Sequence, residues 1–228
     1  MVKQAVITGV SSGIGKAIAQ ILLANGWSVI GLSRTAPNIT DSGLLFHSID
    51  LTDSEALKQY LTRIASVDAI IHAAGAMIAG DIGGLDEHKS LPLWQLNVHA
   101  AEVLVNTLVH KMTRGGRIIL IGSRTSRGVI SRSQYTATKA ALVAMARSWA
   151  AELIPRGITV NIIAPRATDT PMLKDPARKN TKPKCPPIGR YILPEEVANY
   201  ANYLLSPWAD AITGQELVIC GGASLSST

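Results

Sequence analysis

The chain has 228 residues, of which 47% are hydrophobic, so it is long enough to bury a full core, and it fits one large α/β domain over residues 1–228. Its two cysteines, Cys185 and Cys220, lie far apart, which argues against a disulfide framework or a four-ligand zinc site and favours the reducing cytoplasm. No apolar run reaches the roughly 20 residues of a membrane span, and a net charge of +6 with only 4% aromatic residues lacks the pattern of nucleic-acid binding. We therefore expect no metal, no membrane and no nucleic-acid partner.

Apolar segments of strand length alternate with helix-like segments along the whole chain. The expected strands are residues 3–9, 27–33, 44–50, 67–75, 116–123, 157–165 and 216–220. The expected helices are residues 13–25, 54–64, 89–112, 133–154 and 194–205. Asp53 provides an N-cap for the second helix and Pro194 a first-turn proline for the last. This alternation predicts βαβ units and a parallel sheet with no signal peptide before it.

Two segments depart from the regular alternation. Residues 34–43, RTAPNITDSG, are too few and too rich in proline, asparagine and glycine for a packed crossover helix, so this connection is expected to be a loop. Residues 171–190 contain five prolines inside the domain. A long ordered loop of this kind predicts a lid over a substrate.

The sequence TGVSSGIG, residues 8–15, directly follows the first strand and opens the first helix. Gly9 suits a tight turn, Gly13 lets the backbone approach a pyrophosphate, and Gly15 lets the helix and sheet pack closely. The free N–H groups and the dipole of the helix attract phosphate, and Ser11 and Ser12 add hydroxyl donors. The segment predicts a dinucleotide site, and the alternative is a glycine-rich turn without a ligand.

The spacing Thr-Gly-x-x-x-Gly-x-Gly resembles that of the short-chain dehydrogenase/reductase family, and further family motifs follow in order over nearly the whole chain. They are Asp50-Leu51, His72-Ala73-Ala74-Gly75 with histidine and alanine in place of two asparagines, Asn97, Gly122-Ser123, Tyr135 with Lys139, and a C-terminal pattern with Cys220 in place of aspartate. Within that family the chain is similar to the 3-oxoacyl-acyl-carrier-protein reductases. The resemblance implies a Rossmann-like doubly wound sheet in the order 3-2-1-4-5-6-7, a nicotinamide cofactor and a homo-oligomer, tetramer or dimer.

The resemblance also implies the site residues. The catalytic set is Asn97, Ser123, Tyr135 and Lys139. The cofactor contacts are Gly9, Ser11, Ser12, Gly13, Ile14, Gly15, Ser33, Arg34, Asp50, Leu51, Ala74, Gly75, Tyr135, Lys139, Pro165, Thr168 and Thr170. The substrate contacts that it implies are Ser123 and Tyr135. Arg166 is a further candidate substrate contact, because it departs from the family pattern at a position beside the nicotinamide.

Reduction of a carbonyl by hydride moves negative charge onto oxygen, so the site must hold that oxygen and deliver a proton. Tyr135 is the candidate acid, and the cation of Lys139, one helical turn away, favours its phenolate. Ser123 can hydrogen-bond the carbonyl oxygen. The family implies that Lys139 also holds the nicotinamide ribose and that Asn97 supports a water relay; the alternatives are a surface Tyr-Lys pair and an amide that caps or bends a helix.

The end of the second expected strand predicts which cofactor is used. An acidic residue there accepts a hydrogen bond from the ribose 2′-hydroxyl in NAD-dependent proteins, but this chain has Ser33 followed by Arg34. A guanidinium pairs with a 2′-phosphate. The sequence therefore favours NADP(H) over NAD(H), unless Arg34 is simply an exposed residue at the start of a loop.

Basic residues concentrate where the family binds substrate. Pro165 is followed by Arg166 instead of the usual glycine, and residues 166–190 hold seven basic residues against Asp169 and Asp175. An anionic substrate is one interpretation, and a basic surface loop that keeps the protein soluble is the other.

Two classes of function follow. The first is an enzyme, an NADP(H)-dependent oxidoreductase acting on the carbonyl or secondary alcohol of an anionic small molecule, with 3-oxoacyl-acyl-carrier-protein reductase as the alternative substrate class. The second is a non-catalytic nucleotide-sensing protein that uses its basic face for a partner. The intact pair of Tyr135 and Lys139 favours the enzyme.

Overall fold

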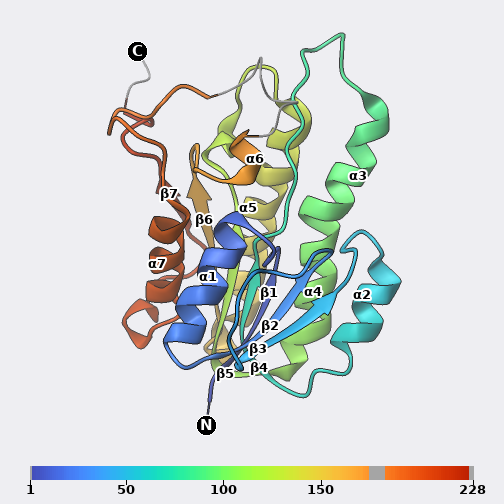
Figure 1. Cartoon of the computed structure of the whole chain (residues 1–228), viewed down its shortest axis with the longest axis vertical. Coiled ribbons are helices and arrows are strands. Elements are labelled where there is room, and N and C mark those ends of the chain that lie inside the picture. Colours follow the sequence, from blue (N-terminus) through green and yellow to red (C-terminus); the bar gives the residue numbers. More distant parts are fainter. Residues whose placement is uncertain (1, 175–182, 226–228) are drawn as a thin grey trace.

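Seven parallel strands form one sheet in the order β3-β2-β1-β4-β5-β6-β7 in the computed structural model, which describes residues 2–174 and 183–225 (Figure 1). In chain order the strands are β1 (Gln4–Thr8), β2 (Ser28–Ser33), β3 (Leu44–Ser48), β4 (Val67–His72), β5 (Met112–Ile121), β6 (Thr159–Pro165) and β7 (Glu216–Ile219). The Rossmann-like fold class and the predicted strand order are confirmed.

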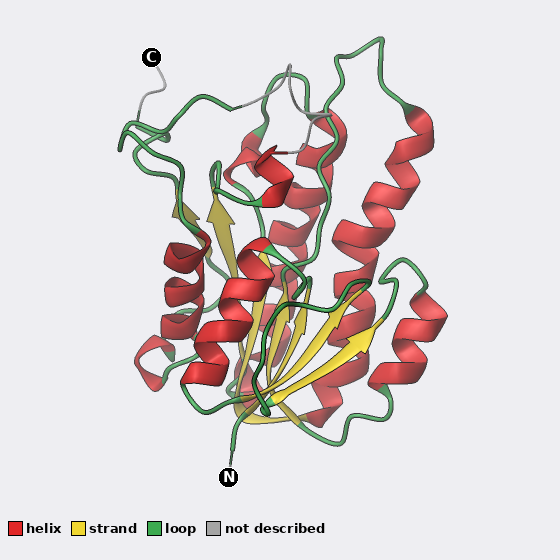
Figure 2. Cartoon of the chain, in the orientation of Figure 1, coloured by secondary structure: helices red, strands yellow, loops and turns green. Residues whose placement is uncertain are grey.

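Helices cover both faces of this sheet (Figure 2). The longer ones are α1 (Gly13–Ala24), α2 (Ser54–Leu61), α4 (Ala100–Leu108), α5 (Ser133–Leu153) and α7 (Pro194–Leu204). The short ones are α3 (Ser90–Trp94), α6 (Pro171–Lys174) and the 3-10 turns η1 (Glu87–Lys89), η3 (Val109–Lys111), η4 (Arg124–Arg127), η5 (Ile154–Arg156) and η7 (Pro207–Ala209). Between α3 and α4 lies a π turn, η2 (Gln95–His99). None of the helices in the described ranges is long and apolar enough to span a membrane.

The start signals read from the sequence are present in the structure. The carboxylate of Asp53 accepts a hydrogen bond from the Ala56 backbone N–H at 3.0 Å and so caps α2. Pro194 is the first residue of α7, where its missing N–H costs nothing. The Glu196 carboxylate accepts from the Leu193 N–H at 2.8 Å, which satisfies one more donor at that end.

Several boundaries differ from the sequence prediction, most of them by one to three residues. The expected helix over 89–112 is divided by the π turn and ends before Met112, where β5 begins, ahead of the expected 116. Helix α2 ends at Leu61 instead of 64, because the Lys111 ammonium donates to the carbonyls of Leu61, Thr62 and Ile64 at 3.0, 2.7 and 2.5 Å. A cation at these carbonyls stabilises the end of the helix. The lysine comes from a distant segment, so local sequence does not indicate it.

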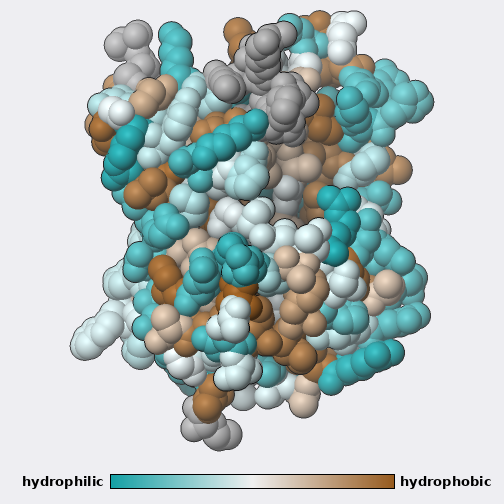
Figure 3. Space-filling view, in the orientation of Figure 1, coloured by the Kyte–Doolittle hydropathy of each residue, from teal (hydrophilic) through white to brown (hydrophobic). Residues whose placement is uncertain are grey.

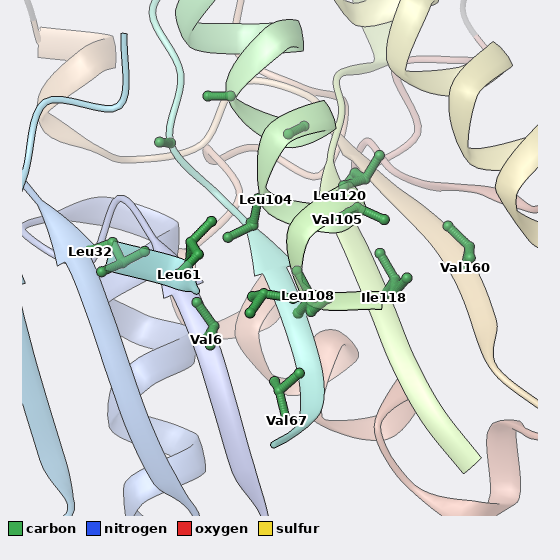
Figure 4. Packing of buried hydrophobic residues seen from close by; sticks show 14 of the residues in the cluster. Val6, Leu32, Leu61, Val67, Leu104, Val105, Leu108, Ile118, Leu120 and Val160 are labelled. Atoms are coloured by element: carbon green, nitrogen blue, oxygen red, sulfur yellow. The ribbon is translucent and has the colours of Figure 1, made fainter. Parts of the chain in front are cut away.

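Two apolar layers hold the fold together, one on each face of the sheet. Successive strand residues point to opposite faces, so Ile70 packs in the layer under α2, α4 and α5, and Ile71 in the layer under α1 and α7. Leu104, Val105 and Leu108 of α4 belong to the first layer, where Val105 lies next to Leu120 (Figure 4). Burial on both faces explains why these strands are apolar without alternation.

The connection between β2 and β3 contains no helix, as predicted for residues 34–43. Its ends are held by short-range hydrogen bonds: the Ser33 hydroxyl donates to the Thr35 carbonyl at 2.8 Å, and the Ser48 hydroxyl to the Arg34 carbonyl at 2.9 Å. The Asp41 carboxylate accepts from the Gly43 N–H at 2.8 Å. This loop places Arg34 at the carboxyl end of β2.

The carboxyl ends of all seven strands lie at one edge of the sheet, toward α6 in Figure 1. Strands β1 and β4 are neighbours, although the chain leaves β1 toward β2 on the other side. Ligands of doubly wound sheets bind at such a reversal of strand order. Polar side chains cover most of the face seen in Figure 3, with apolar residues between them.

Candidate active site

A cavity of about 660 Å³ opens at the carboxyl edge of the sheet. Apart from Asn97, it is lined by every residue that the sequence assigns to a site: Gly9, Ser11, Ser12, Gly13, Ile14, Gly15, Ser33, Arg34, Asp50, Leu51, Ala74, Gly75, Ser123, Tyr135, Lys139, Pro165, Arg166, Thr168 and Thr170. The fold thus brings motifs from the whole length of the chain to one hollow.

The glycines of the first loop are required by close backbone contacts. A Cβ on Gly9 would lie 2.8 Å from the backbone N and Cα of Ala74, and a Cβ on Gly15 would lie 2.3 Å from the Gly9 carbonyl oxygen. Gly9 also has a φ of 75°, which favours glycine. The loop therefore lies directly against the chain that follows β4, so it forms a cradle of backbone.

The N-terminus of α1 opens into this cradle. Ser12 occupies the N-cap position, and within the described residues its side chain makes no capping hydrogen bond. The first N–H groups of the twelve-residue helix are therefore available, and the helix dipole favours an anion there. These features fit the diphosphate of a dinucleotide.

The other end of the cavity is formed by the ends of β2 and β3. Arg34 is exposed at the end of β2. The Asp50 carboxylate accepts from the backbone N–H and the hydroxyl of Thr52 at 2.9 and 2.8 Å. These hydrogen bonds, assisted by the charge of Arg34, lower the pKa of Asp50 against the opposing effect of burial. Asp50 is therefore an ionised hydrogen-bond acceptor beside an arginine.

Ser123 follows β5 and is buried, with 7% of its surface exposed. Its hydroxyl oxygen accepts hydrogen bonds from the Thr125 N–H at 3.2 Å and from the Thr125 hydroxyl at 2.9 Å. A hydroxyl has two acceptor positions and one proton. Because both acceptor positions are filled, the Ser123 proton remains to be donated into the cavity.

Tyr135 and Lys139 lie on one face of α5 and are both buried, at 9% and 4% exposure. The Lys139 ammonium lies 5.8 Å from the centre of the Tyr135 ring and donates to the Ile121 carbonyl at 2.8 Å. Burial lowers the pKa of Lys139 to about 8. The two side chains are therefore not a solvent-exposed Tyr-Lys pair, which was the alternative interpretation of the motif.

Asn97 lies behind the cavity wall in the π turn η2 and is completely buried. Its amide oxygen accepts from the Ala76 N–H at 2.9 Å, and its NH₂ donates to the Ala76 carbonyl and to the Thr138 hydroxyl, both at 3.0 Å. A Cβ on Gly75 would lie 3.1 Å from the amide oxygen and 3.5 Å from the Lys139 nitrogen. Asn97 thus fixes the loop that faces Lys139, and none of these three bonds caps a helix.

Arg166 follows β6 and lies among other cations. The pKa of Arg166 is lowered mainly by burial and further by the positive charges of Arg124 and Arg132. The charge of Cys220 acts in the opposite direction. Its Nε atom is buried without a hydrogen-bond partner in the described part of the chain. The Arg124 guanidinium donates to the Ser224 hydroxyl at 2.9 Å, and this bond brings no negative charge. The region is a concentrated positive field at the cavity.

Part of the predicted lid is described, and it contacts the cavity. Helix α6 begins the segment, and Pro171, Met172 and Leu173 line the cavity together with Pro183. The Lys174 ammonium pairs with the Asp169 carboxylate at 2.9 Å. Residues 175–182, which include three of the seven predicted basic residues, lie outside the described residues. Of the described basic residues in 166–190, Arg166 alone lines the cavity, and Arg34, Lys89, Arg132 and Lys139 line it from elsewhere in the chain.

A family model described as Enoyl-(Acyl carrier protein) reductase matches residues 9–224, and a protein of Rattus norvegicus named "Dehydrogenase/reductase SDR family member 6" is 30% identical over 98% of both chains. The chain belongs to the short-chain dehydrogenase/reductase family. Members of this family are oxidoreductases that bind nicotinamide cofactors and act on small molecules.

Other members cover the chain equally well. A 3-oxoacyl-[acyl-carrier-protein] reductase of Salmonella typhimurium is 33% identical over 96% of each chain, and an NAD-dependent glycerol dehydrogenase of Listeria innocua is 32% identical over 98% of this chain and 94% of its own. Among solved structures, a short-chain dehydrogenase of Burkholderia cenocepacia in complex with NADP is 30% identical with a TM-score of 0.89, over 97% of this chain and 98% of its own.

The structure adds residues that the family motifs did not indicate. Thr125 holds the Ser123 hydroxyl, and Thr138 connects the Asn97 amide to the Tyr135 carbonyl, to which its hydroxyl donates at 2.8 Å. Thr138 falls between the two motif residues on α5, and its position on the same face as Tyr135 is the only sequence signal for it. No group of His, Cys, Asp or Glu suited to a metal ion occurs in residues 2–174 and 183–225.

Proposed function

We propose that this short-chain dehydrogenase/reductase transfers a hydride between NADP(H) and the carbonyl or secondary alcohol of an anionic small molecule. The observation that carries this proposal is the convergence of Ser123, Tyr135 and Lys139 on the cavity that also contains the glycine cradle. When bound, the nicotinamide supplies or accepts the hydride. The chain's own residues then handle the oxygen and its proton.

In the reducing direction, the Ser123 proton is donated to the carbonyl oxygen and orients it. Tyr135 gives its hydroxyl proton to that oxygen as negative charge develops there, so that the carbonyl becomes an alcohol. The Lys139 ammonium stabilises the phenolate left behind, and two of its three protons remain for the ribose and a water after the bond to Ile121. Asn97 holds the Ala76 segment and Thr138 in place beside this pair.

Selection of NADP(H) is supported by the end of β2. Ser33, Arg34 and Thr35 line the cavity there, and the loop that follows presents no carboxylate in the position expected for NAD. The Burkholderia relative was solved with NADP, whereas the Listeria relative is named NAD-dependent. The residues of this chain, rather than family membership, therefore favour the phosphorylated cofactor.

We expect NADPH to bind more tightly than NADH, and the double variant Ser33→Asp, Arg34→Ala to reverse the preference. The change removes the cation and introduces an acceptor for the ribose hydroxyls. Charge-assisted bonds to phosphate contribute roughly 1.5–3 kcal/mol, so the Kd for NADPH should rise about tenfold or more. Titration by fluorescence measures both affinities, with Arg63→Ala, at an exposed arginine outside the cavity, as the control. Equal affinities in the unmodified protein would remove the basis of the proposal.

The anionic substrate is supported by the arrangement around Arg166. This guanidinium lines the same cavity as Ser123 and Tyr135, and two further arginines raise the positive potential around it. A carboxylate or phosphate on the substrate would offset this repulsion and accept hydrogen bonds from the Arg166 guanidinium. The field also steers an anion toward the cavity.

We expect a keto acid to be reduced with a higher kcat/KM than its methyl ester, and Arg166→Gly to remove most of the difference. The loss should be about tenfold or more for the acid and small for the ester, because only the acid uses the guanidinium. Increasing the salt concentration should lower the rate of reduction of the keto acid but not that of the ester. Arg63→Gly, outside the cavity, is the control. An ester that reacts as well as the acid in every variant would show that the basic residues serve solubility.

A 3-oxoacyl-[acyl-carrier-protein] reductase is the second candidate, favoured by the Salmonella relative at 33% identity. A 3-oxoacyl thioester of the carrier protein, offered beside the free keto acid, distinguishes the two. The buried pair of Tyr135 and Lys139 disfavours a non-catalytic nucleotide sensor. A single domain over residues 1–228, a homo-oligomer and a cytoplasmic location stay predictions of the sequence.

A further inference from the structure

His72 is a buried histidine that the proposed chemistry does not use. It is the last residue of β4, and its register in the parallel sheet places it beside Thr8, the last residue of β1. Its exposure is 0%. It stands where the family motif has an asparagine, at the point where the glycine loop and the chain after β4 meet.

The hydrogen bonds of Thr8 determine which nitrogen of this histidine carries the proton. The Thr8 hydroxyl oxygen accepts from the backbone N–H groups of Ala73 and Ala74 at 3.1 and 3.2 Å. Both of its acceptor positions are then filled, so its single proton is donated to the His72 Nδ1 atom, 3.0 Å away. A neutral imidazole that accepts at Nδ1 carries its own proton on Nε2.

Burial and the positive charge of Lys139 keep this ring neutral, because they lower the pKa of His72 to about 3. The Nε2 atom is itself buried and makes no hydrogen bond in the described part of the chain. The backbone carbonyls of Asn97 and Leu96 lie close enough to favour the protonated ring, although this effect is the smaller one. The π turn that carries Asn97 therefore acts on the ring, although no hydrogen bond between its carbonyls and Nε2 is formed within the described residues.

The π turn explains why a donor is needed there. The Ala100 N–H donates to the Gln95 carbonyl five residues earlier, which interrupts the regular bonding to the fourth residue. A carbonyl displaced from the helical ladder inside a protein needs another donor. The buried Nε2–H of His72, which belongs to β4 and not to the helix, is a donor without a partner in the described part of the chain.

We propose that His72 is a positioning residue, which joins Thr8 of the glycine loop to the π turn and thereby holds the Asn97 amide against Ala76 and Thr138. The inference rests on the proposed function, since its kinetic consequence is the alignment of Tyr135 and Lys139. His72 itself touches neither substrate nor cofactor.

Nuclear magnetic resonance tests this assignment without turnover. In ¹⁵N-labelled protein, the His72 ring should show one neutral tautomer with the proton on Nε2 between pH 5 and 9, both alone and with NADPH. Thr8→Ser keeps the hydroxyl and should keep this tautomer, whereas Thr8→Val should lose it. A ring protonated on Nδ1, or a ring that titrates in this range, would overturn the proposal.

The second arm uses a matched pair of variants. His72→Gln keeps an N–H near the position of Nε2, and His72→Leu fills the space without one. In His72→Leu the exchange of the Asn97 side-chain amide protons should become faster, and kcat should fall about tenfold, the effect of one lost hydrogen bond, while the Kd for NADPH stays within about twofold. His72→Gln should restore both properties.

The outcomes separate the possible failures. Equal amide exchange in the two variants, or kcat losses that follow the midpoint of thermal unfolding in both, would mean that His72 only fills space. Absence of turnover with any carbonyl in the unmodified protein would overturn the proposed function, while the tautomer and the amide exchange would still decide the role of His72.

Discussion

Replacing Tyr135 by phenylalanine should lower kcat by about a thousandfold or more, while the protein still folds and binds NADPH normally. The ring packs on α5 with 9% of its surface exposed, and phenylalanine fills the same space. Only the transferable proton is removed. Because proton transfer occurs at the transition state, the loss should appear in kcat and in kcat/KM, with the Kd for the cofactor unchanged.

The measurement is single-turnover oxidation of NADPH with the best available carbonyl, combined with cofactor titration. Tyr203→Phe is the matched control: it makes the same chemical change on α7, where the hydroxyl donates to the Trp208 carbonyl at 3.4 Å outside the cavity. Rates near the unmodified value in Tyr135→Phe would remove this residue as the acid. A parallel loss in Tyr203→Phe would point to stability instead.

Replacing Lys139 by methionine should lower kcat/KM by about a hundredfold or more and also weaken NADPH binding, since one ammonium serves both the tyrosine and the ribose. Lys58→Met, on the exposed face of α2, is the control for the charge change. A loss of rate with unchanged cofactor affinity would contradict the ribose contact. In the unmodified protein, kcat/KM for reduction should decline as the pH rises through about 8, where Lys139 loses its proton.

The same variant should reveal the energetic cost of the buried ammonium. The pKa of Lys139 falls from 10.5 to about 8 on folding, so the folded protein releases this proton at lower pH than the unfolded chain. Between these values the unfolded chain binds more protons, and stability therefore rises with pH. The destabilisation, of about 3 kcal/mol, is fully present below pH 8 and disappears toward pH 10.5.

The free energy of unfolding of Lys139→Met, minus that of the unmodified protein, should accordingly fall by about 3 kcal/mol between pH 7 and 10.5. Denaturant titrations at several pH values measure this difference. The other titrating groups are common to both proteins and largely cancel. Lys58→Met, at an exposed lysine of α2, is the control for the loss of one positive charge. A flat difference for Lys139→Met would mean that the ammonium is not buried in solution.

The sequence by itself determined the sheet, the loop between β2 and β3 and the cradle. Strands buried on both faces must be apolar throughout, so their composition identifies them. The ten-residue connection with Pro37, Asn38 and Gly43 is too short and irregular for a packed helix, which the local sequence also shows. The glycine spacing follows equally from local geometry, because the turn from β1 into α1 leaves no room for a Cβ at Gly15. The family motifs then placed the site residues along the chain.

Only the tertiary structure decided how these residues are used. The length of α2 depends on Lys111, and the break in the helix that carries Asn97 is a π turn beside β4, which the apolar periodicity of residues 89–112 does not indicate. The donor direction of Ser123 follows from the two hydrogen bonds that its hydroxyl accepts from Thr125, and the tautomer of His72 follows from the bonds of Thr8 on a neighbouring strand. Such hydrogen bonds determine which group carries a proton. Where they join distant residues, they form only once the sheet has formed, so a local sequence pattern does not predict them.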